Sequence, residues 1–346
     1  MYSDLFAKND AILVMSGSNR RYFSDFDCSF GCVILTPEKK FLLTDFRYAA
    51  AAREKTEGIE VVSTAPDRLY DDVRRILASA KAKNVGFEDE YVSVAANKIL
   101  KKELADYTLR ALGPELSSLR IVKTEEEIAK IRRAQEITET ALTKTLSLLK
   151  AGVSEKDMSA ELAYQFMTLG DGLAFDSIVA FGENSADCHH VAGDRKLERG
   201  DIVLFDIGAK YRGYCADMTR TFCFGEPSQK LSDLYLLVLS AQQYVLKHLK
   251  AGVTGREADS MAREFFKANG YDSEFGHSLG HGVGIDIHEE PRLSASCDMP
   301  LPENAVVTVE PGLYIEGFGG VRIEDLVVVK KDDIENLTNY DKSLII

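Results

Sequence analysis

The sequence lacks long apolar runs, basic runs and paired cysteine motifs, and each absence argues against a class of protein. No apolar run approaches the roughly 20 residues that cross a membrane, and the first residues lack the profile of a secretory signal peptide. With a net charge of −13 and no cluster of Lys and Arg, we expect neither a nucleic acid nor a membrane as a partner. The six scattered cysteines include no pair of CxxC units, which indicates reduced thiols. Together these absences predict a cytoplasmic protein.

What is present is the composition of an ordinary globular protein. Hydrophobic residues make up 45% of the chain and charged residues 28%. The 346 residues are enough for two domains with a substantial core. Composition gives no further information about chemistry, so the prediction of fold and function has to rest on patterns along the chain.

Residues 1–122 alternate short strand patterns with helix patterns. Strand-like apolar runs occur at 11–15, 32–36 and 59–63, and apolar residues recur at helical spacing over 67–83. This alternation predicts a small α/β domain with a mixed or parallel sheet. We find no catalytic constellation in it.

A second domain, residues 123–346, is expected to begin with a long helix. Its start is marked by a capping box at 124–127, where Thr is followed three residues later by Glu. The sequence Lys-Ala-Gly-Val-Ser at 150–154 then recurs as Lys-Ala-Gly-Val-Thr at 250–254. Each copy is followed by a helix pattern, a histidine segment and two strand-like runs with acids. We therefore expect residues 150–330 to form a duplicated unit, with two halves packed about a pseudo-twofold axis.

The first copy ends in a predicted hairpin that carries Asp206 and Asp217, each inside a strand-like run. If the turn is centred on 211–212, the two acids face each other with their Cβ atoms about 5 Å apart. Two carboxylates among apolar residues are costly unless a positive group lies between them. A metal ion is the simplest candidate.

The second copy ends in a comparable pair of runs, which carry Glu310 and Glu324. A turn at Gly317 would place these two acids opposite each other. Packing of the two halves would then bring four carboxylates to one point.

Three of the six histidines, His277, His281 and His288, lie within twelve residues among glycines. The spacing of the first two suits a zinc-protease helix, but the glycines argue against a helix and the HExxH order is absent. The glycines at 280–284 do not match a phosphate-binding loop either. Oxygen-rich ligands with one imidazole suit a pair of ions such as Mn²⁺, Co²⁺ or Zn²⁺, which could activate a shared water.

Five residues resemble, in their order and context, the metal ligands of the "pita-bread" metallopeptidases: Asp206, Asp217, His281, Glu310 and Glu324. That family includes methionine aminopeptidases, Xaa-Pro aminopeptidases and Xaa-Pro dipeptidases (prolidases). The segments 20–25, 44–48 and 184–186 are similar to the proline-specific branch, which has a creatinase-type N-terminal domain. With these segments the resemblance covers nearly the whole chain.

The resemblance implies an α+β fold, in which a smaller α/β creatinase-like domain precedes a duplicated pita-bread domain with an antiparallel sheet covered by helices. It implies a homodimer that cleaves the Xaa-Pro bond of short proline-containing peptides with two divalent ions, Mn²⁺ or Co²⁺, with Zn²⁺ as an alternative. Asp206 would hold one ion, and His281 and Glu310 the other. Asp217 and Glu324 would bridge both.

The resemblance also assigns catalytic roles. Glu310 would shuttle a proton, and His288 would stabilise the tetrahedral intermediate, while His189 and His277 would contact the substrate. In the predicted site, His189 counts as catalytic with Glu310 and His288. Arg322 lies two residues before Glu324 and so shares its strand face. From there it would orient a ligand carboxylate.

Arg292 resembles the arginine with which small prolidases bind the free carboxylate of a dipeptide, which favours a dipeptidase. Asp187 and Cys188 depart from the family pattern, which has an apolar residue and proline before the histidine. An Xaa-Pro aminopeptidase acting on longer peptides is the alternative. A non-catalytic binding module and a metal-free hydrolase of the creatinase type are disfavoured because all five ligands are present.

Overall fold

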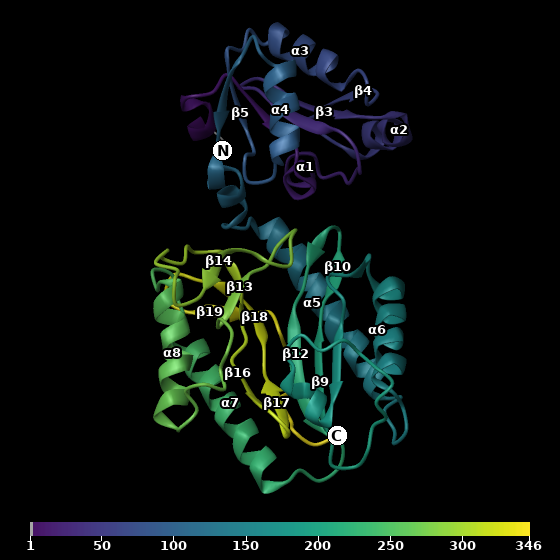
Figure 1. Ribbon diagram of the computed structural model, residues 1–346, viewed down its shortest axis with the longest axis vertical. Coiled ribbons are helices and arrows are strands. Elements are labelled where there is room, and N and C mark those ends of the chain that lie inside the picture. The colour runs from purple at the N-terminus through teal and green to yellow at the C-terminus, as the bar shows by residue number, and fades with distance from the viewer. Residues whose placement is uncertain (1–2) are drawn as a thin grey trace. The chain divides into compact units, whose positions relative to one another are not determined.

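The computed structural model describes residues 3–346 and divides into two compact units, Met1–Arg120 and Ile121–Ile346 (Figure 1). The sequence had suggested a boundary two residues later. No helix in the described part of the chain is long and apolar enough to cross a membrane.

The N-terminal unit is built on one mixed six-stranded sheet in the order β4-β3-β2-β1-β5-β6. Its strands are β1 Ala11–Val14, β2 Cys32–Leu35, β3 Lys40–Thr44, β4 Glu60–Ser63, β5 Asn84–Phe87 and β6 Thr108–Ala111. Its helices are α1 Gly17–Ser24, α2 Phe46–Lys55, α3 Leu69–Ser79 and α4 Val94–Glu103. The short 3₁₀ turns are η1 Ser3–Ala7, η2 Gly113–Glu115 and η3 Ser117–Arg120. The predicted mixed α/β architecture is confirmed.

Both faces of this sheet are covered at its centre, which explains why the central strands β1 and β2 are apolar runs without alternation. Along β1, Ala11 and Leu13 belong to one hydrophobic cluster, whereas Ile12 and Val14 belong to another. All four side chains are buried.

The C-terminal unit consists of two halves with the same order of elements. The first half contains α5 Glu125–Leu146, α6 Glu155–Leu169, β7 Gly172–Leu173, β8 Ile178–Phe181, η4 Gly182–Ala186, β9 Ile202–Ile207, β10 Ala209–Tyr211, β11 Tyr214–Cys215 and β12 Met218–Cys223. The second half contains α7 Gln229–His248, α8 Gly255–Ala268, β13 Gly280–Gly282, β14 Glu289–Leu293, β15 Val306–Val309, β16 Gly312–Ile315, β17 Gly319–Arg322, β18 Asp325–Val329 and β19 Ile334–Asn336. In Figure 1 the strands of this unit lie between α6 and the pair α7 and α8.

Equivalent backbone hydrogen bonds show that the two halves are related. Gly152 N–H donates to the carbonyl of Leu197, and Gly252 N–H donates to the carbonyl of Leu301, both at 2.9 Å. The capping box expected at the start of α5 is formed, and capping boxes also begin α6 and α8. Each half also has its own hydrophobic cluster between its helices and strands. These features agree with the predicted α+β pita-bread fold.

The register predicted for the first hairpin is wrong. Asp206 pairs with Thr219 and not with Asp217. The turn consists of Arg212 and Gly213, both with positive φ (46° and 78°), one position later than expected. Positive φ at both central residues is what a two-residue hairpin of the type I′ class requires. Asp217 instead lies in a break between β11 and β12, diagonal to Asp206.

The register predicted for the second hairpin is confirmed. Val309 pairs with Asp325 on one side of the two glutamates, and Ile315 pairs with Gly319 on the other. Gly317 lies in the connecting turn with a φ of 71°.

The two hairpins are hydrogen-bonded to each other across the centre of the unit. Glu324 N–H donates to the carbonyl of Thr219 at 3.1 Å, and Thr221 Oγ1 donates to the carbonyl of Arg322 at 2.8 Å. Arg322 N–H in turn donates to Thr221 Oγ1 at 3.1 Å. The acidic side chains of both halves are thereby held against one another.

Candidate active site

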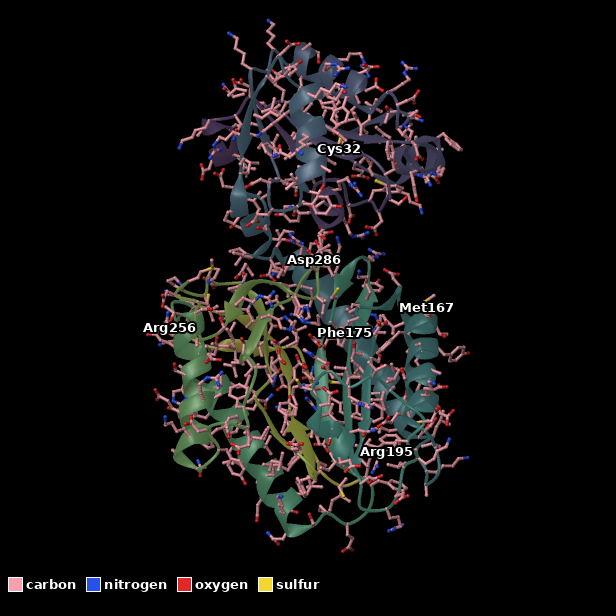
Figure 2. The ribbon with its side chains drawn as sticks, in the orientation of Figure 1. Cys32, Met167, Phe175, Arg195, Arg256 and Asp286 are labelled. Atoms are coloured by element: carbon pink, nitrogen blue, oxygen red, sulfur yellow. The ribbon has the colours of Figure 1, made fainter. Side chains whose placement is uncertain are left out.

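A cavity of about 320 Å³ lies within the C-terminal unit. Its lining includes all ten residues selected from the sequence: His189, Asp206, Asp217, His277, His281, His288, Arg292, Glu310, Arg322 and Glu324. None of them lines the larger hollow of about 640 Å³ between α5 and the C-terminal segment. The other lining residues were not selected as site residues from the sequence, and they are Phe175, Ile178, Cys188, Ser278, Gly280 and Ile287. Figure 2 shows Phe175 among the strands, whereas Met167 and Arg256 lie at the outer edges of the unit.

Three carboxylates converge in this cavity. Asp206, Asp217 and Glu324 each offer one oxygen, and these oxygens lie within 4.8 Å of one another. Burial, followed by the charges of Glu324 and Asp206, raises the pKa of Asp217 well above its ordinary value. Burial, followed by Glu310 and Asp206, does the same to the pKa of Glu324. Asp217 Oδ1 is buried without a hydrogen-bond partner among the described residues.

An imidazole nitrogen points at these carboxylates. His281 Nε2 lies 3.4 Å from Glu310 Oε1 and 3.6 Å from Asp217 Oδ2. The other ring nitrogen, Nδ1, lies 3.1 Å from the carbonyl oxygen of Gly282, so it carries the proton and donates it. Burial, and after it the nearby His288, lowers the pKa of His281 to about 3. The lone pair of a neutral ring therefore faces carboxylate oxygens.

These donors fit a divalent metal ion. Lone pairs and negative charges facing one another without a cation or shared protons are unfavourable, and a cation removes that conflict. The oxygen-rich set with a single imidazole is typical of Mn²⁺, Co²⁺ and Zn²⁺. Glu310, whose pKa burial raises to about 8, belongs to the same set.

Two threonines that the sequence analysis missed orient the acids. Thr219 Oγ1 donates to Glu324 Oε2 at 2.7 Å, and Thr308 Oγ1 donates to Glu310 Oε1 at 3.0 Å. Both could have been found, because each is two residues from an acid. Residues two apart on a strand share a face.

Arg322 lies where the sequence suggested, directly against a carboxylate. Its Nη2 donates to Asp206 Oδ2 at 2.6 Å, and its Nε donates to Thr219 Oγ1 at 3.0 Å. Its Nη1 donates to the hydroxyl of Tyr314 at 2.6 Å, which lies 2.9 Å from His277 Nε2. No spacing rule pointed to Tyr314, because this contact joins separate segments of the chain.

The donors and acceptors in this hydrogen-bond chain can be assigned from the groups at its two ends, the Arg322 guanidinium and the Ser278 carbonyl. His277 Nδ1 lies 2.8 Å from the carbonyl of Ser278 and must donate to it, so Nε2 accepts from Tyr314. Burial, followed by the charge of Arg322, lowers the pKa of His277 to about 4. The imidazole is therefore neutral and held in one orientation.

Three more of the selected residues form an exposed rim. His189, His288 and Arg292 are all solvent-exposed while lining the cavity. Arg292 pairs with His281 across β13 and β14, and the rings of His281 and His288 lie 4.3 Å apart. Burial, followed by Arg292, lowers the pKa of His288. The rim thus offers imidazole and guanidinium groups next to the acids.

Two related halves that enclose a cavity in which four carboxylates and the unprotonated nitrogen of His281 face one another are typical of a metal-dependent hydrolase. Comparison with protein families names it more closely. Residues 129–331 match metallopeptidase family M24, and residues 7–122 match the creatinase/prolidase N-terminal domain. The chain belongs to metallopeptidase family M24, which confirms the resemblance identified in the sequence.

Similar proteins of known structure extend over the whole chain. The X-Pro aminopeptidase from Thermotoga maritima MSB8 is 40% identical, covers 100% of both chains and superposes with a TM-score of 0.94. The Xaa-Pro dipeptidase from Bacillus anthracis is 38% identical, with a TM-score of 0.93 over 98% of this chain and 95% of that one. The Xaa-Pro dipeptidase of Pyrococcus horikoshii is 35% identical over 97% of this chain and 94% of its own length. The chain is thus a metallopeptidase whose relatives include both dipeptidases and aminopeptidases.

Proposed function

We propose that the protein hydrolyses the Xaa-Pro bond of dipeptides with two divalent metal ions. The observation that carries this proposal is the cavity itself, where four carboxylates and His281 Nε2 converge below an exposed guanidinium, that of Arg292. The relatives named Xaa-Pro dipeptidase support the choice of bond.

Asp206 would hold one ion, and His281 and Glu310 the other, with Asp217 and Glu324 shared by both. Mn²⁺ or Co²⁺ is proposed, with Zn²⁺ as the alternative. When bound, such ions supply an activated water and polarise the scissile carbonyl.

The remaining steps use the chain's own groups. Glu310 takes a proton from the attacking water and passes it to the leaving proline nitrogen. His288 donates a hydrogen bond to the oxygen that becomes negatively charged. His189 contacts the substrate from the rim of the cavity and His277 does so beside Tyr314.

Arg292 would bind the free carboxylate of the dipeptide, because a guanidinium recognises a carboxylate with two parallel hydrogen bonds.

An Xaa-Pro aminopeptidase that accepts longer peptides is the second candidate, favoured by the 40% identity to the Thermotoga maritima enzyme. A non-catalytic binding module is disfavoured because all five expected ligands line the cavity. We also propose that the protein is a cytoplasmic homodimer. Sedimentation analysis would test the oligomeric state.

The test measures hydrolysis of Ala-Pro, Ala-Pro-Ala and Met-Ala by metal-stripped protein after addition of Mn²⁺, Co²⁺ or Zn²⁺. We expect Ala-Pro to be cleaved best and Met-Ala not at all. Equal rates on the dipeptide and the tripeptide would favour the aminopeptidase. No cleavage of either proline peptide with any of the metals would refute the proposal.

A further inference from the structure

The loop between β8 and β9 brings two side chains to the wall of the cavity. Cys188 and His189 both line it. The loop begins with η4 and continues as irregular chain as far as Gly193. His189 itself is exposed, and its N–H donates to Asp187 Oδ1 at 3.0 Å, a contact within the loop. Something outside this segment must therefore hold it in place.

That role falls to Glu155, the first residue of α6, whose side chain is 0% exposed. Its carboxylate accepts four hydrogen bonds from the loop and from the strand end before it: from Phe181 N–H at 2.9 Å, Asn184 Nδ2 at 2.8 Å, His190 Nε2 at 2.9 Å and Gly193 N–H at 2.9 Å. Each oxygen receives two of them. One carboxylate thus ties together both ends of the segment that carries His189.

The ionised form of Glu155 is the one that fits. Burial is the largest influence and raises the pKa of Glu155, but the hydrogen bonds from His190, Asn184 and the two backbone amides outweigh it and leave that pKa below its ordinary value. Four donors match the acceptor capacity of a carboxylate, and they would not match an amide. Glu155 does not line the cavity, so it acts only through the loop.

The other half of the unit supports this interpretation. The equivalent first residue of α8 is Gly255, and a Cβ there would lie 2.1 Å from the carbonyl oxygen of Arg292. In both halves, then, the first residue of the second helix contacts a segment that carries a rim residue, His189 in one and Arg292 in the other. The repeat has diverged from a carboxylate clamp to a close backbone contact.

We propose that Glu155 is a positioning residue, which fixes His189 at the cavity wall through the 181–193 loop and thereby sets the affinity for the peptide substrate. The inference rests on the proposed function only for the identity of that substrate. His190 is one of the donors in this clamp.

The test compares Glu155→Gln with Asp157→Asn. Asp157 belongs to the capping box of the same helix, and its ion pair with Lys196 at 3.8 Å lies outside the 181–193 segment, so its variant controls for helix stability. For Glu155→Gln we expect KM for Ala-Pro to rise about tenfold or more, with kcat changed by less than about threefold, because misplacement of a contact group weakens binding. Mn²⁺ affinity should be unchanged in both variants.

A second measurement keeps the inference independent of activity. Hydrogen exchange of the backbone amides in 181–193 should become faster in Glu155→Gln and stay unchanged in Asp157→Asn. His190→Leu, which removes one donor and leaves three, should show a smaller change in the same direction if Glu155→Gln does not fold.

Unchanged KM together with unchanged exchange in Glu155→Gln would overturn the inference, as would equal effects in Asp157→Asn. If the wild-type protein cleaves no proline peptide, the proposed function is refuted but the inference about Glu155 is not. The exchange experiment then still decides whether Glu155 holds the loop.

Discussion

At the scale of single residues, the cavity holds titratable groups whose protonation depends on one another. The pKa values of Asp217, Glu310 and Glu324 are raised, first of all by burial. Those of His277 and His281 are lowered, again mainly by burial. All of these shifts disfavour the charged form, so the metal-free protein is under electrostatic strain that a cation relieves.

The metal-stripped protein should lose stability as the pH rises from about 6.5 to about 8. Glu310 has a pKa of about 8 in the folded protein against an ordinary value of 4.5, so the folded state binds more protons and stability falls with pH. Below 6.5 the histidines oppose this trend, because His277 and His281 bind protons more readily unfolded. Thermal unfolding of stripped protein across this range measures the effect.

Two controls isolate the cause. Glu310→Gln should flatten the dependence, and saturating Mn²⁺ should reverse it, since metal binding requires deprotonated ligands. A melting temperature of the stripped protein that rises between these pH values would contradict the assignment.

Asp217→Asn should stabilise the metal-free protein while removing its function. The substitution removes an acid whose ionisation is opposed by burial and by neighbouring carboxylates, so we expect the melting temperature of stripped protein to rise by a few degrees, on the order of 1 kcal/mol. Bound metal and hydrolysis should be lost, because an amide does not replace a bridging carboxylate. Metal analysis, calorimetry and rates on Ala-Pro measure the three outcomes.

The matched control is Asp259→Asn, a buried acid on α8 that is paired with Arg263 and accepts the Leu279 N–H. Its loss should lower the melting temperature and leave the metal bound. Retained metal and rate in Asp217→Asn would disprove its role as a ligand.

At the scale of elements, the two hairpins show what could be predicted from the sequence. The alternation of strand patterns with a glycine between them was enough to place Glu310 opposite Glu324. For Asp206 and Asp217 the turn was set one residue too early, because Arg212 was not expected to take a positive φ. The two acids still meet, since the strand breaks next to Asp217 and Gly208 lets the chains approach.

That close approach at Gly208 illustrates what the sequence could not reveal. A Cβ at this position would lie 2.0 Å from the carbonyl oxygen of Ala216. The contacts of Tyr314 with His277 and of Glu155 with Asn184 likewise join segments that are distant along the chain. Periodicity reports the face of an element, whereas such contacts depend on how separate elements pack.

Gly255→Ala should disturb the rim of the cavity through the backbone. The added Cβ would clash with the carbonyl oxygen of Arg292, which has to move. Overpacking of this kind destabilises by about 1–3 kcal/mol. We expect a lower melting temperature together with a higher KM for Ala-Pro.

Gly17→Ala serves as the control, since a Cβ there meets no atom within 4 Å. It should leave KM and stability nearly unchanged. If Gly255→Ala behaves in the same way, the carbonyl of Arg292 is not held by this contact.

At the scale of the whole molecule, the C-terminal segment is hydrogen-bonded to residues next to an acid that lines the cavity. Arg220 is fully buried, and its five N–H groups all donate: to the carbonyls of Thr219, Glu324, Tyr340 and Asp341 and to Asp325 Oδ1. Lys342 Nζ donates to Asp325 Oδ2 at 2.5 Å. The end of the chain therefore helps to fix the backbone of an acid in the cavity.

Arg220→Met should destabilise the protein by about 3–5 kcal/mol, because it leaves Asp325 buried without its main counter-charge. Lys342→Met should cost less, about 1–3 kcal/mol, since Arg220 remains. Urea unfolding of the two variants measures the difference.

The exposed pair of Arg256 with Asp298 provides the comparison. Arg256→Met should change stability by less than about 1 kcal/mol. Equal losses of stability in Arg256→Met and Arg220→Met would show that the buried network stabilises the protein no more than an exposed ion pair does.

The hydrogen bonds that join the two hairpins also set an order of events during synthesis. The first hairpin leaves the ribosome with Asp206 and Asp217 long before Glu310 and Glu324 have been translated. Until the second half arrives, three of the five proposed ligands are missing and the first two acids are accessible to water. Under the proposed ligand assignment, metal loading follows translation of nearly the entire chain, and a nascent protein that stalls before the second hairpin would expose an acidic ribbon without the remaining ligands.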